Sequence, residues 1–237
     1  TCWTPVARAL EANYDVIMPD ARGHGNSSPP NQGYSYDILA ADVLHLIEAL
    51  KLINPVLLGH SMGGMTAALA ASQNPKQLRG LILVDPTFLT PERQREVHES
   101  NIADQHRRIL DQPKEDLLAD LRIRHKHRSP ELIELFAQAR FQTSIYAFEI
   151  LTPPNPDYRQ LITTLSMPTL LIIGGANGIV SPMVAAELAG LNQHLETAQI
   201  TEAGHGIPYD QPDRFLAIVK TFLHSIIPIT RTSPQNS

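Results

Sequence analysis

The sequence predicts an α/β protein built on a doubly wound, mostly parallel sheet, with a helical cap inserted into it. Short apolar runs of strand character alternate with stretches of helical periodicity along most of the chain, a pattern typical of parallel sheets covered by helices on both faces. One long interval of charged, helical sequence interrupts this alternation. The 237 residues, of which 43% are hydrophobic, suffice for one large domain with such an insertion.

The first half of the chain carries three predicted strands. Apolar runs over residues 14–18, 55–58 and 80–84 predict these strands. Apolar residues at helical spacing predict helices over residues 1–10 and 36–50. A further Ala-rich helix follows the second strand and is expected to end near the Asn74-Pro75 pair.

The character of the sequence changes over residues 88–154. This segment holds 10 of the 19 basic and 11 of the 24 acidic residues of the chain, and its apolar residues are spaced for amphipathic helices. The balance of sign argues against a nucleic-acid-binding arm. We therefore expect residues 88–154 to form a helical cap, and residues 1–87 and 155–229 to form the core.

The alternation resumes in the last third of the chain. Residues 169–173 and 195–200 predict strands, and residues 182–191 and 212–227 predict helices. The polar tail, residues 230–237, is expected to be disordered.

Composition excludes several classes of partner. The net charge of −5 gives no reason to expect nucleic acid or an anionic membrane surface. No run of about 18 apolar residues predicts a membrane span. A single cysteine, Cys2, fits a reducing compartment, so we expect a cytoplasmic protein. We expect no cofactor and no metal, and the sequence leaves the oligomeric state open.

The motif Gly59-His60-Ser61-Met62-Gly63 lies between a predicted strand and a predicted helix. That context distinguishes a nucleophile elbow from a chance match. Ser61 is expected to be held in a strained conformation at the helix N-terminus. There, the Met62 N–H is expected to stabilise a developing oxyanion.

A serine nucleophile needs a base, and the base needs a third group that fixes its tautomer. His205, in a Gly-His-Gly loop after the last predicted strand, is the best candidate for the base. Two residues compete for the third role. Asp85 ends a core strand, whereas Asn177 lies in the loop after the following strand, where a carboxylate would first be sought.

The chain resembles α/β-hydrolase-fold enzymes of the serine esterase and lactonase type. The matching segments are residues 20–27, 59–64, 174–182 and the Gly204-His205 pair. Most members carry aspartate at the position of Asn177, whereas a minority carry the acid where Asp85 lies, so the resemblance favours Asp85. It also implies that the N-terminal strands and a loop that supplies a second oxyanion donor precede the sequence given.

The resemblance implies a cofactor-independent hydrolase that cleaves a small apolar carboxylic ester or lactone through an acyl-enzyme on Ser61. A C–C bond hydrolase of the same fold is the first alternative, and a non-catalytic ligand-binding or receptor protein is the second. The cap is expected to set the size of the substrate. The pocket is expected to be lined by His60, Phe136, Phe141, Ile179 and Ile207.

Overall fold

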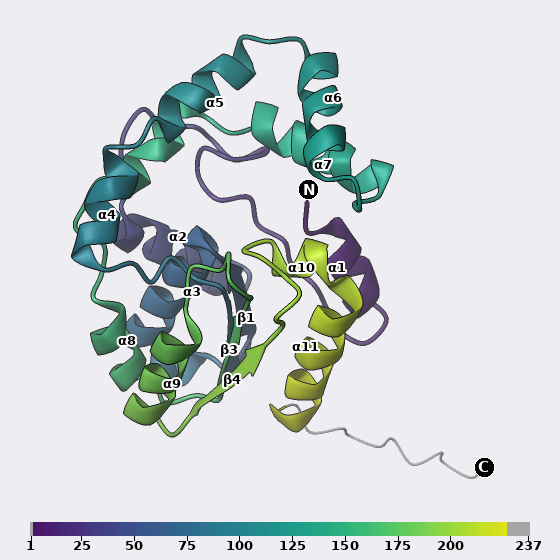
Figure 1. The fold of residues 1–237 in the computed structure, drawn as a ribbon. Helices are drawn as coiled ribbons and strands as arrows, with labels where there is room; N and C mark the ends of the chain where they lie inside the picture. The colour runs from purple at the N-terminus through teal and green to yellow at the C-terminus, as the bar shows by residue number, and fades with distance from the viewer. Residues whose placement is uncertain (1, 227–237) are drawn as a thin grey trace.

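The computed structural model describes residues 2–226, and its centre is a four-stranded parallel sheet (Figure 1). The strands are β1 (Val56–His60), β2 (Gly80–Val84), β3 (Thr169–Ile173) and β4 (Leu195–Gln199), and they lie side by side in chain order. Each neighbouring pair is parallel. The predicted parallel sheet is therefore confirmed.

Helices cover both faces of this sheet, as Figure 1 shows. One face carries α2 (Tyr36–Ala49), α3 (Met62–Gln73), α8 (Tyr158–Thr164) and α9 (Pro182–Leu191). The other carries α1 (Thr4–Leu10) and α11 (Pro212–Ile226). Each face has its own apolar cluster, so the doubly wound arrangement is also confirmed.

The two central strands explain why the sheet forms where the sequence predicts it. Every residue of β2 and β3 is buried, and all but Gly80 and Thr169 are Leu, Ile or Val. A strand covered on both faces needs such a continuous apolar run. Two of the helices on the sheet begin at capping residues, since the Ser35 and Ser181 hydroxyls accept backbone N–H groups of α2 and α9.

The interval between β2 and α8 is helical. It contains α4 (Pro91–His98), α5 (Ile102–Leu110), α6 (Lys114–Arg124), α7 (Pro130–Phe141) and the 3₁₀ helix η2 (Ile145–Leu151), most of which arch over the end of the sheet (Figure 1). We call residues 91–151 the helical segment. It has a small apolar cluster of its own, centred on Leu117, Leu118, Ile133 and Ala137. The assignment of residues 88–154 as a separate cap remains a prediction.

Two short helices complete the described chain. The 3₁₀ helix η1 (Pro75–Gln77) follows α3, and α10 (Ile207–Asp210) lies between β4 and α11. No helix within residues 2–226 combines the length and the apolar character that a bilayer crossing requires.

One predicted strand is wrong. Residues 14–18 are not part of any strand among residues 2–226, and Ile17 and Met18 are 42% and 48% exposed. The apolar run is present, but its backbone finds no described strand to pair with, and an isolated segment cannot form a sheet ladder. The predicted first helix begins at Thr4. Residue 1, the predicted end of the last helix and the predicted disordered tail lie outside the described residues.

Candidate active site

Ser61 sits in a sharp turn between β1 and α3 with φ 56° and ψ −123°, a backbone conformation that only glycine adopts readily. Small neighbours make this turn possible. A Cβ on Gly59 would lie 2.1 Å from the Gly63 carbonyl oxygen, and one on Gly64 would lie 2.8 Å from the Pro86 Cβ. The glycines therefore let strand and helix approach closely enough to project the Ser61 hydroxyl beyond the sheet.

Ser61, His205 and Asp85 form one hydrogen-bonded chain. His205 Nε2 lies 2.9 Å from Ser61 Oγ, and His205 Nδ1 lies 2.7 Å from Asp85 Oδ2. Because the Asp85 carboxylate accepts, Nδ1 carries the proton and Nε2 is free to accept the Ser61 hydroxyl proton. The Asp85 side chain is fully buried, whereas that of His205 is 38% exposed. This arrangement has the geometry of an activated serine nucleophile.

The loop that contains Asn177 supports Asp85 through its backbone. The Ile179 N–H donates to both Asp85 oxygens, at 3.0 and 2.9 Å, and the Val180 N–H donates to Oδ1 at 3.0 Å. Asn177 makes no hydrogen bond to His205 or to any other described residue. Asp85 therefore occupies the third position of the chain, and the loop after β3 provides donors instead of the acid.

The backbone next to Ser61 offers a donor for an oxyanion. Met62 is the first residue of α3, and its N–H has no hydrogen-bond partner within residues 2–226. An unpaired N–H at a helix N-terminus is oriented to stabilise negative charge. Met62 is thus well placed for the predicted role, and a second donor from a preceding segment remains a prediction.

His60 packs against His205 and does not line the cavity described below. The two rings are 4.6 Å apart, and the His60 Nε2–H donates to the His205 carbonyl at 2.7 Å. Burial, together with the nearby charge of His205, lowers the pKa of His60 to about 4. His60 is therefore a neutral group that packs against the backbone and ring of His205, and its expected place in the wall of the substrate pocket stays a prediction.

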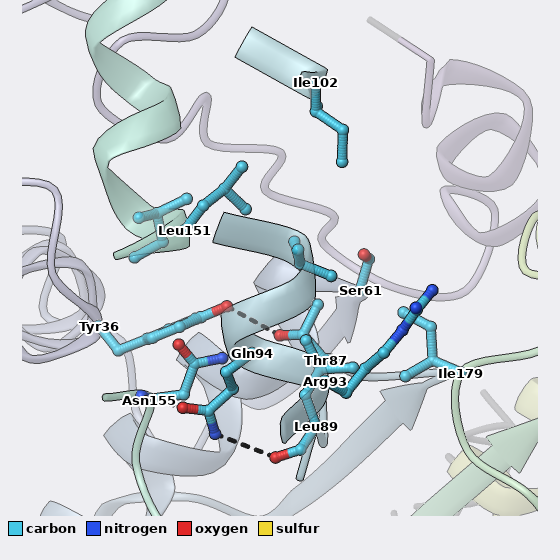
Figure 2. A pocket seen from close by; sticks show the side chains of 12 residues that line it. Tyr36, Ser61, Thr87, Leu89, Arg93, Gln94, Ile102, Leu151, Asn155 and Ile179 are labelled. Atoms are coloured by element: carbon cyan, nitrogen blue, oxygen red, sulfur yellow. Dashed lines mark hydrogen bonds between the residues drawn. The ribbon is translucent and has the colours of Figure 1, made fainter. Parts of the chain in front are cut away.

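A cavity of about 260 Å³ opens beside Ser61 (Figure 2). Its lining residues are Tyr36, Ser61, Thr87, Leu89, Arg93, Gln94, Val97, Ile102, Ile150, Leu151, Asn155 and Ile179. They come from the core and from the helical segment, so both parts shape the space above the serine. The wall is mostly apolar and includes one cationic residue, Arg93.

Of the five residues expected in the pocket, Ile179 lines this cavity and the other four do not. Phe136 packs edge-on against Tyr209, with ring centroids 4.8 Å apart. Phe141 packs on the apolar cluster of the helical segment, and Ile207 is fully buried on the α11 side of the sheet. These three apolar side chains therefore pack one element of the fold against another.

The cavity wall also contains polar groups that the sequence did not predict. The Tyr36 hydroxyl lies 2.8 Å from Thr87 Oγ1. Gln94 Nε2 donates to the Leu89 carbonyl at 3.0 Å (Figure 2). Gln94 Oε1 accepts the Asn155 N–H at 2.9 Å. In sequence, Gln94 is one polar residue in a charged helix, and no spacing distinguishes it. Only the packing of α4 brings it to the cavity.

The described residues contain no group of three or more His, Cys, Asp or Glu side chains arranged to hold a metal ion. Near Ser61, the groups whose geometry supports chemistry are the Ser61 hydroxyl, the His205 ring, the Asp85 carboxylate and the backbone around them.

Comparison with known proteins assigns the family. The sequence profile of the α/β hydrolase fold matches residues 2–212. The chain belongs to this family, which confirms the resemblance found in the sequence and the class of enzyme, a hydrolase.

Three relatives illustrate the range of the family. N-formylmaleamate deformylase of Pseudomonas putida is 32% identical, over 93% of this chain and 83% of its own. The sn-1-specific diacylglycerol lipase ABHD11 of Mus musculus is 28% identical, over 88% of this chain and 71% of its own. The structure of a thermophilic esterase from Thermogutta terrifontis, with malate bound, superposes with a TM-score of 0.77 at 26% identity, covering 95% of this chain and 85% of the esterase.

Proposed function

We propose that this protein is a cofactor-independent serine hydrolase that cleaves a carboxylic ester or lactone through an acyl-enzyme on Ser61. The observation that carries the proposal is the hydrogen-bonded chain from Ser61 through His205 to Asp85. Lipase and esterase relatives support ester bonds as the target.

Acylation follows from the tautomer of His205. Nε2 takes the Ser61 proton while Oγ attacks the substrate carbonyl, and Asp85 stabilises the imidazolium that results. The Met62 N–H, at the positive end of α3, faces the oxygen on which charge develops. His205 then gives the proton to the departing alkoxide. For a lactone, this alkoxide stays tethered, so the ring opens.

Deacylation reverses the roles. Water attacks the acyl carbonyl while His205 Nε2 accepts its proton, and the same nitrogen returns the proton to Ser61 as the acid product leaves. Residues 88–154, as the proposed cap, restrict water and select substrates by size, since α4, α5 and η2 contribute half of the cavity wall.

A second candidate is an amide hydrolase that acts on a small carboxylate-bearing amide. The 32% identity to a protein named N-formylmaleamate deformylase favours it. So does Arg93, which lines the cavity and carries the positive charge that would attract a substrate carboxylate. Arg93 also pairs with Glu96 at 2.6 Å on the exposed surface, so substrate would compete with that partner.

Intact mass after exposure to a fluorophosphonate tests the proposed nucleophile, with Ser61→Ala as the control. We expect one adduct on the wild type and none on the variant. No adduct on folded wild-type protein would contradict the proposal and favour a non-catalytic ligand-binding protein.

A substrate panel separates the hydrolase candidates. Neutral p-nitrophenyl esters and γ-lactones represent the first, N-formylmaleamate the second and a vinylogous diketone the C–C bond hydrolase. Arg93→Gln should weaken only the acidic amide, raising its KM by about tenfold, while turnover of neutral esters stays the same.

A further inference from the structure

The loop that carries His205 is held on both flanks. On one side, the His60 ring supports the His205 carbonyl. On the other, the Asp210 Oδ2 accepts the N–H of Gly204, the residue before the histidine, at 3.2 Å. Asp210 Oδ1 in turn lies 2.7 Å from Arg128 Nη2. A chain of polar contacts therefore runs from Arg128 to the residue next to the proposed base.

Arg128 belongs to the helical segment, in the turn between α6 and α7, whereas Asp210 ends α10 in the core. Their side chains are only 14% and 28% exposed. The Arg8–Glu131 pair also joins core to helical segment, but it is 61% and 59% exposed. An exposed pair contributes little, whereas a sheltered, hydrogen-bonded pair resists separation.

Two further features fix the Arg128 guanidinium in place. It lies over two rings, 4.8 Å from the Phe136 centroid and 5.7 Å from that of Tyr209. A Cβ on Gly206 would come within 2.9 Å of Arg128 Nη2, so the loop packs directly against the arginine. The residue after His205 is therefore in contact with the same side chain that anchors the residue before it.

We propose that Arg128 is a positioning residue, which fixes the His205 loop through Asp210. It thereby couples the packing of the helical segment on the core to the position of the base. The inference depends on the proposed role of His205. Proton transfer needs His205 Nε2 within hydrogen-bond reach of Ser61, and a misplacement of about 1 Å can cost about 100-fold in rate. If the helical segment moves away from the core, Arg128 leaves Asp210 and the His205 loop loses this support.

Amide hydrogen exchange across residues 203–210 tests the contact without requiring activity. The variants are Arg128→Met, which keeps the aliphatic stem, and Arg128→Lys, which keeps the charge. Arg8→Met is the matched control, because it also removes an ion pair between core and helical segment. We expect exchange at Gly204 to rise about tenfold in Arg128→Met and to stay at the wild-type rate in Arg8→Met.

Turnover of p-nitrophenyl acetate tests the consequence. In Arg128→Met, we expect kcat to fall about 10- to 100-fold with KM within about twofold of wild type. Arg128→Lys should recover most of the loss. Asp210→Asn, a second variant in case Arg128→Met does not fold, should lower kcat in the same way, and the double variant should be no worse than Arg128→Met alone.

Unchanged exchange at Gly204 in folded Arg128→Met and Asp210→Asn would overturn the inference, and so would raised exchange with unchanged kcat. Failure of the proposed function looks different. In that case, wild-type protein shows neither turnover nor a fluorophosphonate adduct, while the exchange measurement still decides whether Arg128 holds the loop.

Discussion

The central sheet and the helical segment of this protein differ in the burial and the charge of their side chains. In β2 and β3, all ten residues are buried. In the helical segment, several charged residues pair with one another on the surface, as in Arg93–Glu96, Arg107–Asp104 and Arg124–Asp120, all more than 45% exposed. The sheet contributes two members of the hydrogen-bonded chain directly after its strands, whereas the helical segment contributes cavity wall.

This contrast teaches where sequence change is tolerated. A side chain in the sheet contacts neighbours on all sides, and its loss leaves a cavity that the structure cannot close. Breaking an exposed ion pair lowers the free energy of unfolding only slightly. The sheet should therefore dominate stability and the proposed chemistry. Exposed positions of the helical segment should accept substitution, and its cavity-lining positions should alter which substrates enter, with Arg128 as the exception that acts on the base. Four substitutions test this division.

The largest effect is expected at the end of β2. Asp85→Asn should lower kcat by about four orders of magnitude, because an amide fixes the wrong tautomer of His205 and cannot stabilise imidazolium. Asn177→Ala, the matched change in the neighbouring loop, should alter kcat less than about threefold, since Asn177 makes no hydrogen bond to His205. A larger loss in Asn177→Ala than in Asp85→Asn would reverse the assignment.

Leu171→Ala, in the middle of β3, comes next. Leu171 is fully buried, so the free energy of unfolding in urea should fall by about 2–5 kcal/mol. A fall of less than about 1 kcal/mol would mean that the sheet relaxes around the cavity, and the contrast with the helical segment would lose its basis.

His60, the last residue of β1, tests how the core responds to acid. Its folded-state pKa of about 4 lies below the ordinary value of 6.5, so the unfolded chain binds a proton that the folded chain does not. The free energy of unfolding then falls as pH falls from about 6.5 to 4. Below that range, His60 causes no further change. Between pH 7 and 5, the wild type should lose about 2 kcal/mol more than His60→Gln.

Urea unfolding at both pH values measures this difference. Glutamine keeps an N–H donor for the His205 carbonyl, so the comparison isolates the titration. Parallel losses in the two proteins would show that His60 is protonated as readily in the fold as out of it.

The smallest effect is expected on the surface of the helical segment. Arg124→Ala removes an ion pair with Asp120 one turn away on α6, and both side chains are largely exposed. The free energy of unfolding should change by less than about 0.5 kcal/mol. A loss comparable to that of Leu171→Ala would mean that the two regions do not differ in the way proposed here.

The sequence predicted elements best where local pattern and tertiary environment agree. The runs that become β2 and β3 are apolar and are buried on both faces, so pattern and burial give the same answer. The run at residues 14–18 has the same local pattern, but a strand needs a partner, and pairing is not encoded in a single segment.

The site divides in the same way. The elbow residues and His205 were found because motif and position after a strand indicate their place. The residues alone left Asp85 and Asn177 open, and the resemblance favoured Asp85. What the sequence did not predict is that backbone donors of the Asn177 loop support that acid. Gln94 and Asn155 carried no local signal at all, because only the packing of helix against core directs them to the cavity.

Ile179 has two functions that do not interfere with each other. Its backbone N–H holds Asp85, while its side chain lines the cavity. Any residue except proline can supply that N–H. Position 179 is therefore a site at which directed evolution can reshape substrate preference while the support of the acid stays constant, so a saturation library there should be rich in active clones.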